Sequence, residues 1–279
     1  YTPDPADPTR GILVDTADPD ATARTFRQVT GSDDDHTAWQ WFYDRMALIA
    51  QRVFPTMIEP LRSAAEIHDL VMGTDSSEAE MWEDLTERPL GELIERCFEH
   101  ELVRGIVATD ALIGTFADLH DPLLRQNICF LYHLIGGGTG DWDVPVGGMG
   151  AVSGALYQAA TAAGAEIATS VRIDGVDPVD GTVESSLGAL RGEMIYAGCA
   201  PAVINRLLDE PIDTESSPAG AQLKINLLLD RLPRLRDDTV EPQAAFAGTF
   251  HINERFDQLQ EAFRVAQRGE FPGLPPCEI

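Results

Sequence analysis

The strongest chemical signal in the sequence is a glycine-rich segment. Residues 147–154 have the sequence GGMGAVSG. Glycines let the backbone approach a flat or charged group, and free N–H groups at a helix start attract anions. The segment resembles a dinucleotide fingerprint, but Ser153 stands where G-x-G-x-x-G requires glycine, and Pro145 removes a donor from any strand before it. We therefore predict a small-residue helix packed against a flat or anionic neighbour. An independent Rossmann-type NAD site remains the alternative.

Other catalytic patterns are weak. Ser153 does not form a nucleophile elbow, because G-x-S-x-G requires a glycine two residues earlier and Gly150 is three residues back. The histidines show no metal-ligand spacing, so we expect surface or core roles, no metal site and no assignable catalytic acid or base. The four cysteines form no C-x-x-C pair, which favours a reduced, cytoplasmic setting. The histidines are His36, His68, His100, His120, His133 and His251, and the cysteines are Cys97, Cys129, Cys199 and Cys277.

The charge of the chain restricts its partners. Among 279 residues, 46 acids and 20 bases give a formal net charge of −26, and Lys224 is the only lysine. Such a chain repels phosphate backbones, so we expect no nucleic-acid partner. No apolar run approaches the ~20 residues that a membrane helix needs. Peripheral membrane contact stays open.

The elements that would position these groups begin with helices. Asp18 followed by Pro19 predicts a helix start and a helix over 20–28. A second helix follows Ser32, because apolar residues recur at spacings of three and four until Pro55. Further helices are predicted at 60–73, 90–103, 105–117 and 121–135. The apolar positions of the second helix are Trp39, Phe42, Met46, Ile49 and Val53.

Beyond residue 136 the pattern becomes mixed. A helix is predicted over 151–163, ending at Gly164, and a hairpin turn at Asp180-Gly181. Strands are predicted at 166–173, 189–197, 222–229 and 246–251, and helices at 202–208 and 254–268. The first residues and the last segment lead us to expect an internal fragment of a longer protein.

The segment from Leu134 to about Glu210 resembles the flavin amine-oxidase superfamily, in its phytoene dehydrogenase and carotenoid isomerase-like branch. The resemblance rests on the motif WDVPVGGMGAV at 142–152, on GAEIAT at 164–169, and on the strand and turn KINLLLDRLP at 224–233. These segments occur in the family's order. One position departs from its pattern, because Cys199 stands where the family has asparagine before alanine-x-proline.

The resemblance implies a FAD-dependent oxidoreductase acting on an apolar or amine-type substrate. It places Gly147, Gly148 and Met149 near the flavin ring or its approach, and the backbone of Val171 beside the adenine. It implies an α+β fold in which a substrate-binding domain, a mixed sheet with helical cover, carries an inserted segment of the FAD domain. The implied boundaries are 1–143 and 206–279 for the substrate domain, and 144–205 for the middle segment of the FAD domain.

This chain alone would bind FAD poorly and be inactive, because most phosphate contacts would lie outside it. A non-enzymatic lipid- or isoprenoid-binding module is the second alternative reading of the sequence.

Overall fold

The protein has an α+β fold, as predicted from its sequence. The computed structural model describes residues 1–72, 76–138, 145–211, 220 and 222–279. The chain divides into two compact units, which are described separately. Unit 1 comprises residues 1–142 and 220–279, and unit 2 comprises residues 143–219. The predicted loop residues 139–141, most of the predicted loop 209–219, and the Trp142 end of the family motif lie outside the described residues.

The first two helices of unit 1 form where local signals predict them. Helix α1 (Pro19–Thr30) begins at Asp18, whose carboxylate accepts a hydrogen bond of 2.9 Å from the N–H of Ala21. This bond satisfies one of the free donors at the helix start. Helix α2 (Asp34–Val53) buries the predicted apolar stripe, with Trp39 partly exposed, and a 3-10 turn containing Pro55 (η1, Phe54–Ile58) follows. The predicted start and end of the second helix are therefore confirmed.

The remaining helices of unit 1 close around α2. Their bounds are α3 (Ala64–Val71), α4 (Ser76–Glu87), α5 (Leu90–Cys97), α6 (Glu101–Leu112) and α7 (Arg125–Ile135). Helix α4 was not predicted. The predicted helix at 90–103 is divided between α5 and α6, because Phe98 is extended and His100 caps α6 through its side chain. The core includes Phe42, Phe98 and Phe130, which are fully or almost fully buried.

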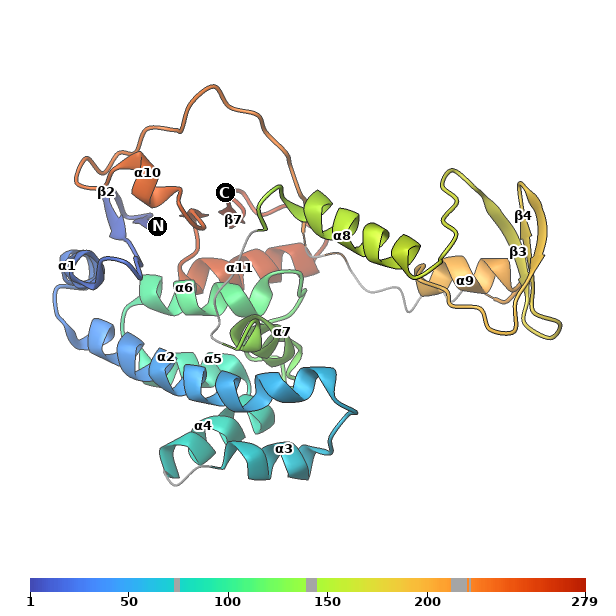
Figure 1. Cartoon of the computed structure of the whole chain (residues 1–279). Helices are drawn as coiled ribbons and strands as arrows, with labels where there is room; N and C mark the ends of the chain where they lie inside the picture. Colours follow the sequence, from blue (N-terminus) through green and yellow to red (C-terminus); the bar gives the residue numbers. More distant parts are fainter. Residues whose placement is uncertain (73–75, 139–144, 212–219, 221) are drawn as a thin grey trace. The chain divides into compact units, whose positions relative to one another are not determined.

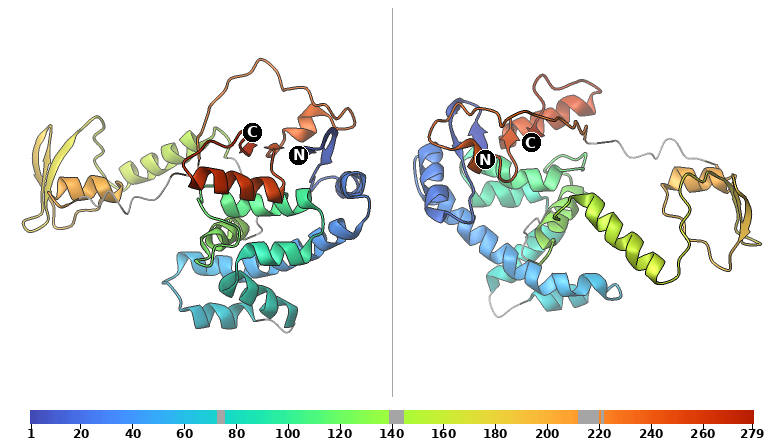
Figure 2. Two further views of the ribbon diagram at one scale, coloured as in Figure 1. Left: turned by 180° about the vertical axis from the view of Figure 1, so that it is seen from behind. Right: turned by 45° about the horizontal axis from the view of Figure 1, so that its top comes forward.

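Short antiparallel strands complete unit 1. Strand β1 (Thr2–Asp4) pairs with β2 (Asp7–Ile12), and β6 (His251–Ile252) pairs with β7 (Cys277–Glu278). The N–H of His251 donates to the carbonyl of Tyr1, which joins the two pairs. Helix α11 (Phe256–Gln267), predicted at 254–268, follows β6 and packs along α6 (Figure 1 and Figure 2). The chain thereby brings segments about 150 residues apart into contact.

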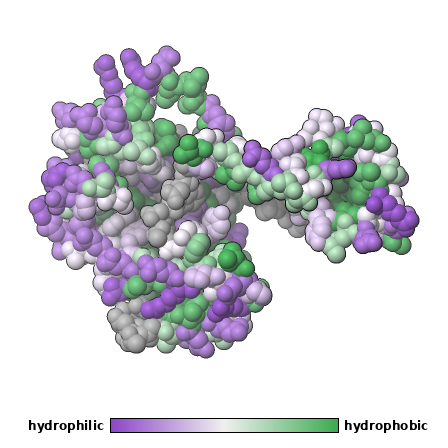
Figure 3. All heavy atoms as spheres, in the orientation of Figure 1, coloured by the Kyte–Doolittle hydropathy of each residue, from purple (hydrophilic) through white to green (hydrophobic). Residues whose placement is uncertain are grey.

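Unit 2 combines two helices with a small sheet. Helix α8 (Met149–Ala162) precedes the antiparallel strands β3 (Ile173–Asp177), β4 (Thr182–Ser185) and β5 (Gly188–Arg191), and α9 (Pro201–Leu207) follows them. None of the described residues of unit 2 is buried. Figure 3 shows hydrophobic residues gathered at the surface of its sheet. Unit 2 therefore has no core of its own among these residues.

Several predicted strands are wrong. Residues 166–172 lie outside any strand, and the predicted strand at 189–197 ends at Arg191. The predicted strand at 222–229 is irregular and exposed along its described length. The prediction at 246–251 overlaps β6 only at its end, because the short helix α10 (Pro242–Ala245) and a turn precede it. A strand is stabilised by pairing, and in the described structure no neighbouring strand pairs with residues 222–229.

Candidate functional site

The glycine segment singled out in the sequence leads into α8. Gly147 and Gly148 have positive φ values of 91° and 69°, and α8 begins at the next residue, Met149. Gly148 combines its φ with a ψ of −169°, a conformation open almost only to glycine. These two glycines are therefore required by the backbone.

The start of α8 has no side-chain cap. Its N-cap residue is Gly148, which has no side chain to accept from the first free N–H groups. A β-carbon added at Gly148 or Gly150 would meet no atom within 4 Å in the described structure. The positive end of the helix dipole is therefore open to a flat or anionic neighbour. The Ser153 hydroxyl donates to the carbonyl of Met149, one helical turn earlier, at 3.4 Å.

Val171 belongs to the same unit but comes from a different part of it. It precedes β3, and the adjacent residue Arg172 exchanges hydrogen bonds with Ser186. The chain leaves the C-terminal end of α8 before it reaches Val171, whereas the glycines lie at the N-terminal end (Figure 1). The structure thus brings Gly147, Gly148 and Met149 together and does not bring Val171 beside them.

A polar cluster in unit 1 was missed by sequence reasoning. We define the polar cluster as His251, Glu254 and Glu278, whose ligand-type atoms all lie within 4.8 Å of one another. His251 and Glu278 are direct partners in the β6–β7 ladder, and His251 Nδ1 lies 2.5 Å from Glu254 Oε2. The hydroxyl of Thr109, on α6, donates to the same Glu254 oxygen at 2.6 Å.

The backbone around Glu254 is held in place by close packing. Gly105 of α6 lies so near that a β-carbon there would stand 1.8 Å from the carbonyl oxygen of Glu254. Asn253 adopts a positive φ of 62°, and its side chain donates to the carbonyl of Leu274. Helix α11 then starts at Phe256. These contacts direct the Glu254 carboxylate into unit 1, where its side chain is 3% exposed.

Carboxylates outnumber basic groups around the polar cluster. Glu278 is exposed on one side. Partial desolvation by its neighbours, and then the nearby Glu254 carboxylate, raise the pKa of Glu278 to about 7, while His251 acts in the opposite direction. Burial also raises the pKa of Asp110, the residue after Thr109, with Glu254 adding to the effect and His133 and His251 opposing it. Burial of a carboxyl group beside other carboxylates favours its uncharged form. The polar cluster therefore favours a bound proton or another positive charge.

The sequence contained only a partial signal for this cluster. His251 and Glu254 form an H-x-x-E pair, but Glu278 lies in a different strand and Thr109 is 145 residues from Glu254. Only the packing of α6 against the segment after β6 brings these side chains together. The general expectation for His251, a surface or core residue, did not anticipate its carboxylate partners.

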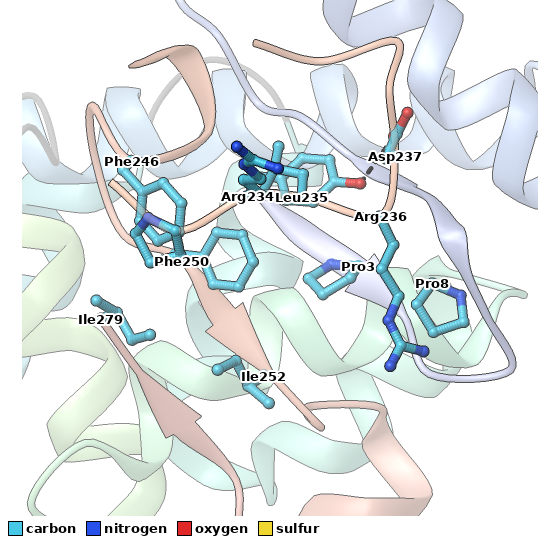
Figure 4. A pocket seen from close by; sticks show the side chains of 12 residues that line it. Pro3, Pro8, Arg234, Leu235, Arg236, Asp237, Phe246, Phe250, Ile252 and Ile279 are labelled. Atoms are coloured by element: carbon cyan, nitrogen blue, oxygen red, sulfur yellow. Dashed lines mark hydrogen bonds between the residues drawn. The ribbon is translucent and has the colours of Figure 1, made fainter. Parts of the chain in front are cut away.

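Unit 1 also contains a cavity of about 300 Å³, which lies between β1, β6 and residues 233–237 (Figure 4). The rings of Phe246 and Phe250 stack with centroids 4.5 Å apart, and the centroids of the Tyr1 and Phe250 rings are 5.6 Å apart. The Tyr1 hydroxyl donates to buried Asp237 at 2.8 Å. These side chains give the cavity a mainly apolar lining.

Comparison with curated proteins identifies relatives along the whole chain. An uncharacterized protein of Mycobacterium tuberculosis (strain ATCC 25618 / H37Rv) is 46% identical over 288 residues, covering 100% of this chain and 53% of the relative. An uncharacterized protein of Mycobacterium bovis has the same identity and coverage. This chain therefore spans about half the length of these relatives. No family model matches the chain, and no solved structure matches it.

More distant relatives have a descriptive name. Pyridine nucleotide-disulfide oxidoreductase domain-containing protein 2 of Rattus norvegicus is 27% identical over 254 residues, covering 80% of this chain and 42% of that protein. Its Mus musculus counterpart is 25% identical over the same length. The chain is a distant homologue of both proteins. Among the described residues, no helix combines the length and apolar character that crossing a membrane requires.

Proposed function

We propose that this chain is the central part of a FAD-dependent oxidoreductase of the phytoene dehydrogenase-like kind. The observation that carries the proposal is the start of α8. There, two glycines with positive φ lead into a helix whose N-terminus has no side-chain cap. The family motif matched in the sequence includes these same residues. The name of the distant rat and mouse relatives supports an oxidoreductase of this general class.

The proposed division of labour follows the predicted boundaries. Residues 144–205 would form the middle segment of the FAD domain, and 1–143 and 206–279 the substrate domain. No described residue of unit 2 is buried, and this supports the division, because an apolar surface without a core indicates covering by further polypeptide or a ligand. The relatives extend well beyond the part that matches this chain.

The residues present fit a flavin neighbour at the α8 start. Gly147, Gly148 and Met149 would lie against the ring or its approach, where space is open beside Gly148. The backbone at Val171 would contact the adenine. FAD would supply the electron or hydride chemistry, and the protein would orient the partners. The positive end of the α8 dipole would stabilise a negatively charged or electron-rich part of the cofactor at this position.

The substrate would be apolar or amine-type. The aromatic lining of the Tyr1, Phe246 and Phe250 cavity supports an apolar body. The same lining also supports the second candidate, a non-enzymatic module that holds a lipid or an isoprenoid. An NAD-binding Rossmann enzyme has less support, because the described sheet of unit 2 is antiparallel and the classical Rossmann sheet is parallel.

The first test uses the full-length protein in which this segment occurs. We expect the purified protein to carry bound flavin with absorbance near ~450 nm, as flavin cofactors show. Gly148→Val should remove most of the flavin, because valine strains this backbone and would fill the open space. Purified full-length protein without flavin, and with no absorbance gained on adding FAD, would refute the proposal.

A matched control distinguishes loss of flavin from loss of folding. Gly188, the first residue of β5 after the turn from β4, has a φ of 110°, and a β-carbon added there would also meet no atom within 4 Å in the described structure. Gly188→Val therefore introduces comparable backbone strain in the same unit. We expect it to retain flavin, and circular dichroism should show both variants folded. Equal flavin loss in both variants would argue against a specific role for Gly148.

A further inference from the structure

We propose that His251, Glu254 and Glu278 form a binding site for a divalent transition-metal ion, with Zn²⁺ as the probe. One imidazole and two carboxylates form a ligand set that suits Zn²⁺ and similar ions, and three protein ligands leave a position for water. This inference stands on unit 1 alone and is independent of the flavin proposal.

The arrangement of the three residues is close to that of a metal site. His251 and Glu278 face each other across the β6–β7 ladder, and Glu254 follows His251 by three residues. Their ligand-type atoms already lie within 4.8 Å of one another. Ligands placed 2.0–2.2 Å from a tetrahedral ion are separated by about 3.4 Å. Side-chain adjustments of about 1 Å would therefore complete the coordination, with the His251–Glu254 hydrogen bond replaced by bonds to the ion.

The charge balance of the region favours a cation. Glu254, Glu278 and Asp110 influence one another electrostatically, and the opposing positive influence on them comes from histidines. In the described part of the chain, no arginine or lysine forms an ion pair with any of these three acids, and the ion-pair partner of Glu254 is His251. Within the cluster Glu254 is buried, whereas Glu278 lies at its exposed edge. A buried carboxylate without a compensating charge is costly. A divalent ion would remove this cost.

The surroundings already orient one ligand. Thr109 donates to Glu254 Oε2, and outer hydrogen bonds of this kind fix ligating carboxylates in metal sites. The close approach of Gly105 to the Glu254 backbone limits movement of that residue. Glu254 would thus be the preset ligand, while His251 and Glu278 close around the ion from neighbouring strands.

A shared proton is the competing explanation for the same cluster, and binding measurements separate the two. The chain is freed of metal with EDTA, exchanged into chelator-free buffer near neutral pH, and titrated with ZnCl₂ by calorimetry. We expect one saturable site at micromolar or lower concentration. Glu278→Gln and His251→Gln should each weaken binding at least about tenfold, because each removes one of three ligands. If the chain binds no Zn²⁺, the shared proton is the remaining explanation and the proposal is overturned.

The control addresses thiols, which also bind Zn²⁺. Cys277, adjacent to Glu278, and Cys199 are both free and exposed. Cys277→Ser and Cys199→Ser should leave the affinity unchanged within about twofold. Co²⁺ in place of Zn²⁺ should give visible bands without a thiolate charge-transfer band in the near ultraviolet. Affinity lost in a cysteine variant but retained in Glu278→Gln and His251→Gln would contradict the assignment. Circular dichroism checks that each variant is folded.

Discussion

At the scale of single residues, the position of Glu254 depends on a glycine in another element. Gly105 of α6 packs directly against the backbone of residue 254, and Thr109, one turn later, donates to its carboxylate. A side chain at residue 105 would separate α6 from the segment that follows β6. The polar cluster therefore depends on a residue that has no functional group.

We expect Gly105→Ala to lower the free energy of unfolding of unit 1 by about 1–3 kcal/mol, the usual cost of overpacking. The added β-carbon would stand 1.8 Å from the Glu254 carbonyl oxygen, and backbone must shift to accept it. Urea unfolding followed by tryptophan fluorescence measures the change. Gly248→Ala is the control, since its β-carbon meets no atom within 4 Å and should have little effect. Equal midpoints for both variants would contradict the expected clash.

At the scale of elements, a buried side chain fixes the corner between α4 and α5 onto α7. Asn127 of α7 is 1% exposed. Its oxygen accepts from the N–H of Leu90 at 3.0 Å, and its nitrogen donates to the carbonyls of Leu85 and Arg88 at 2.9 and 2.7 Å. This one amide thus satisfies groups at the end of α4, in the turn, and at the start of α5.

Asn127→Ala should lower the free energy of unfolding by about 2–4 kcal/mol, because it leaves buried backbone groups without partners. Ile128→Ala is a matched control on the same helix, where the native side chain is 68% exposed. That change should stay within about 0.5 kcal/mol, as for most surface substitutions. Guanidinium unfolding curves of the two variants measure both changes in the free energy of unfolding. A loss below about 1 kcal/mol for Asn127→Ala would show that water replaces the amide.

At the scale of the whole molecule, the two units differ in how much they bury. Unit 1 has a continuous apolar core around α2, α6 and α7. Unit 2 has no buried residue in its described part, and it exposes apolar side chains from both α8 and its sheet. Local stability follows buried apolar contacts, so the two units should open with different free energies. The exposed apolar residues of unit 2 include Met149, Leu156, Tyr157 and Leu190.

Native-state hydrogen exchange should therefore protect the amides of α6 and α7 far more strongly than those of α8 and β3–β5. Local opening of unit 2 requires little apolar surface to be exposed, whereas opening of unit 1 exposes its core. Exchange measured by mass spectrometry on this chain tests the difference. Similar protection in both units would show that unit 2 is covered in solution. If flavin binds at the start of α8, the amides of α8 should be more strongly protected from exchange in the full-length protein.

The sequence alone determined the features that depend on neighbouring residues. Asp18 begins α1, and the apolar spacing of 39–53 selects the buried face of α2. Gly164 ends α8 with a φ of 90°, and Gly181 takes a φ of 74° in the predicted hairpin turn. In each case the backbone preference or the helical period acts over a few residues, so the pattern is visible in the sequence.

Tertiary structure decided the features that depend on distant partners. The apolar run at 222–229 has strand-like composition but remains irregular, because a strand requires a neighbour to pair with. The polar cluster forms only because α6 packs against the turn after β6 and because β7 returns beside β6. Pairing and packing join residues far apart in the chain, and no local preference of His251, Glu254 or Glu278 specifies their meeting.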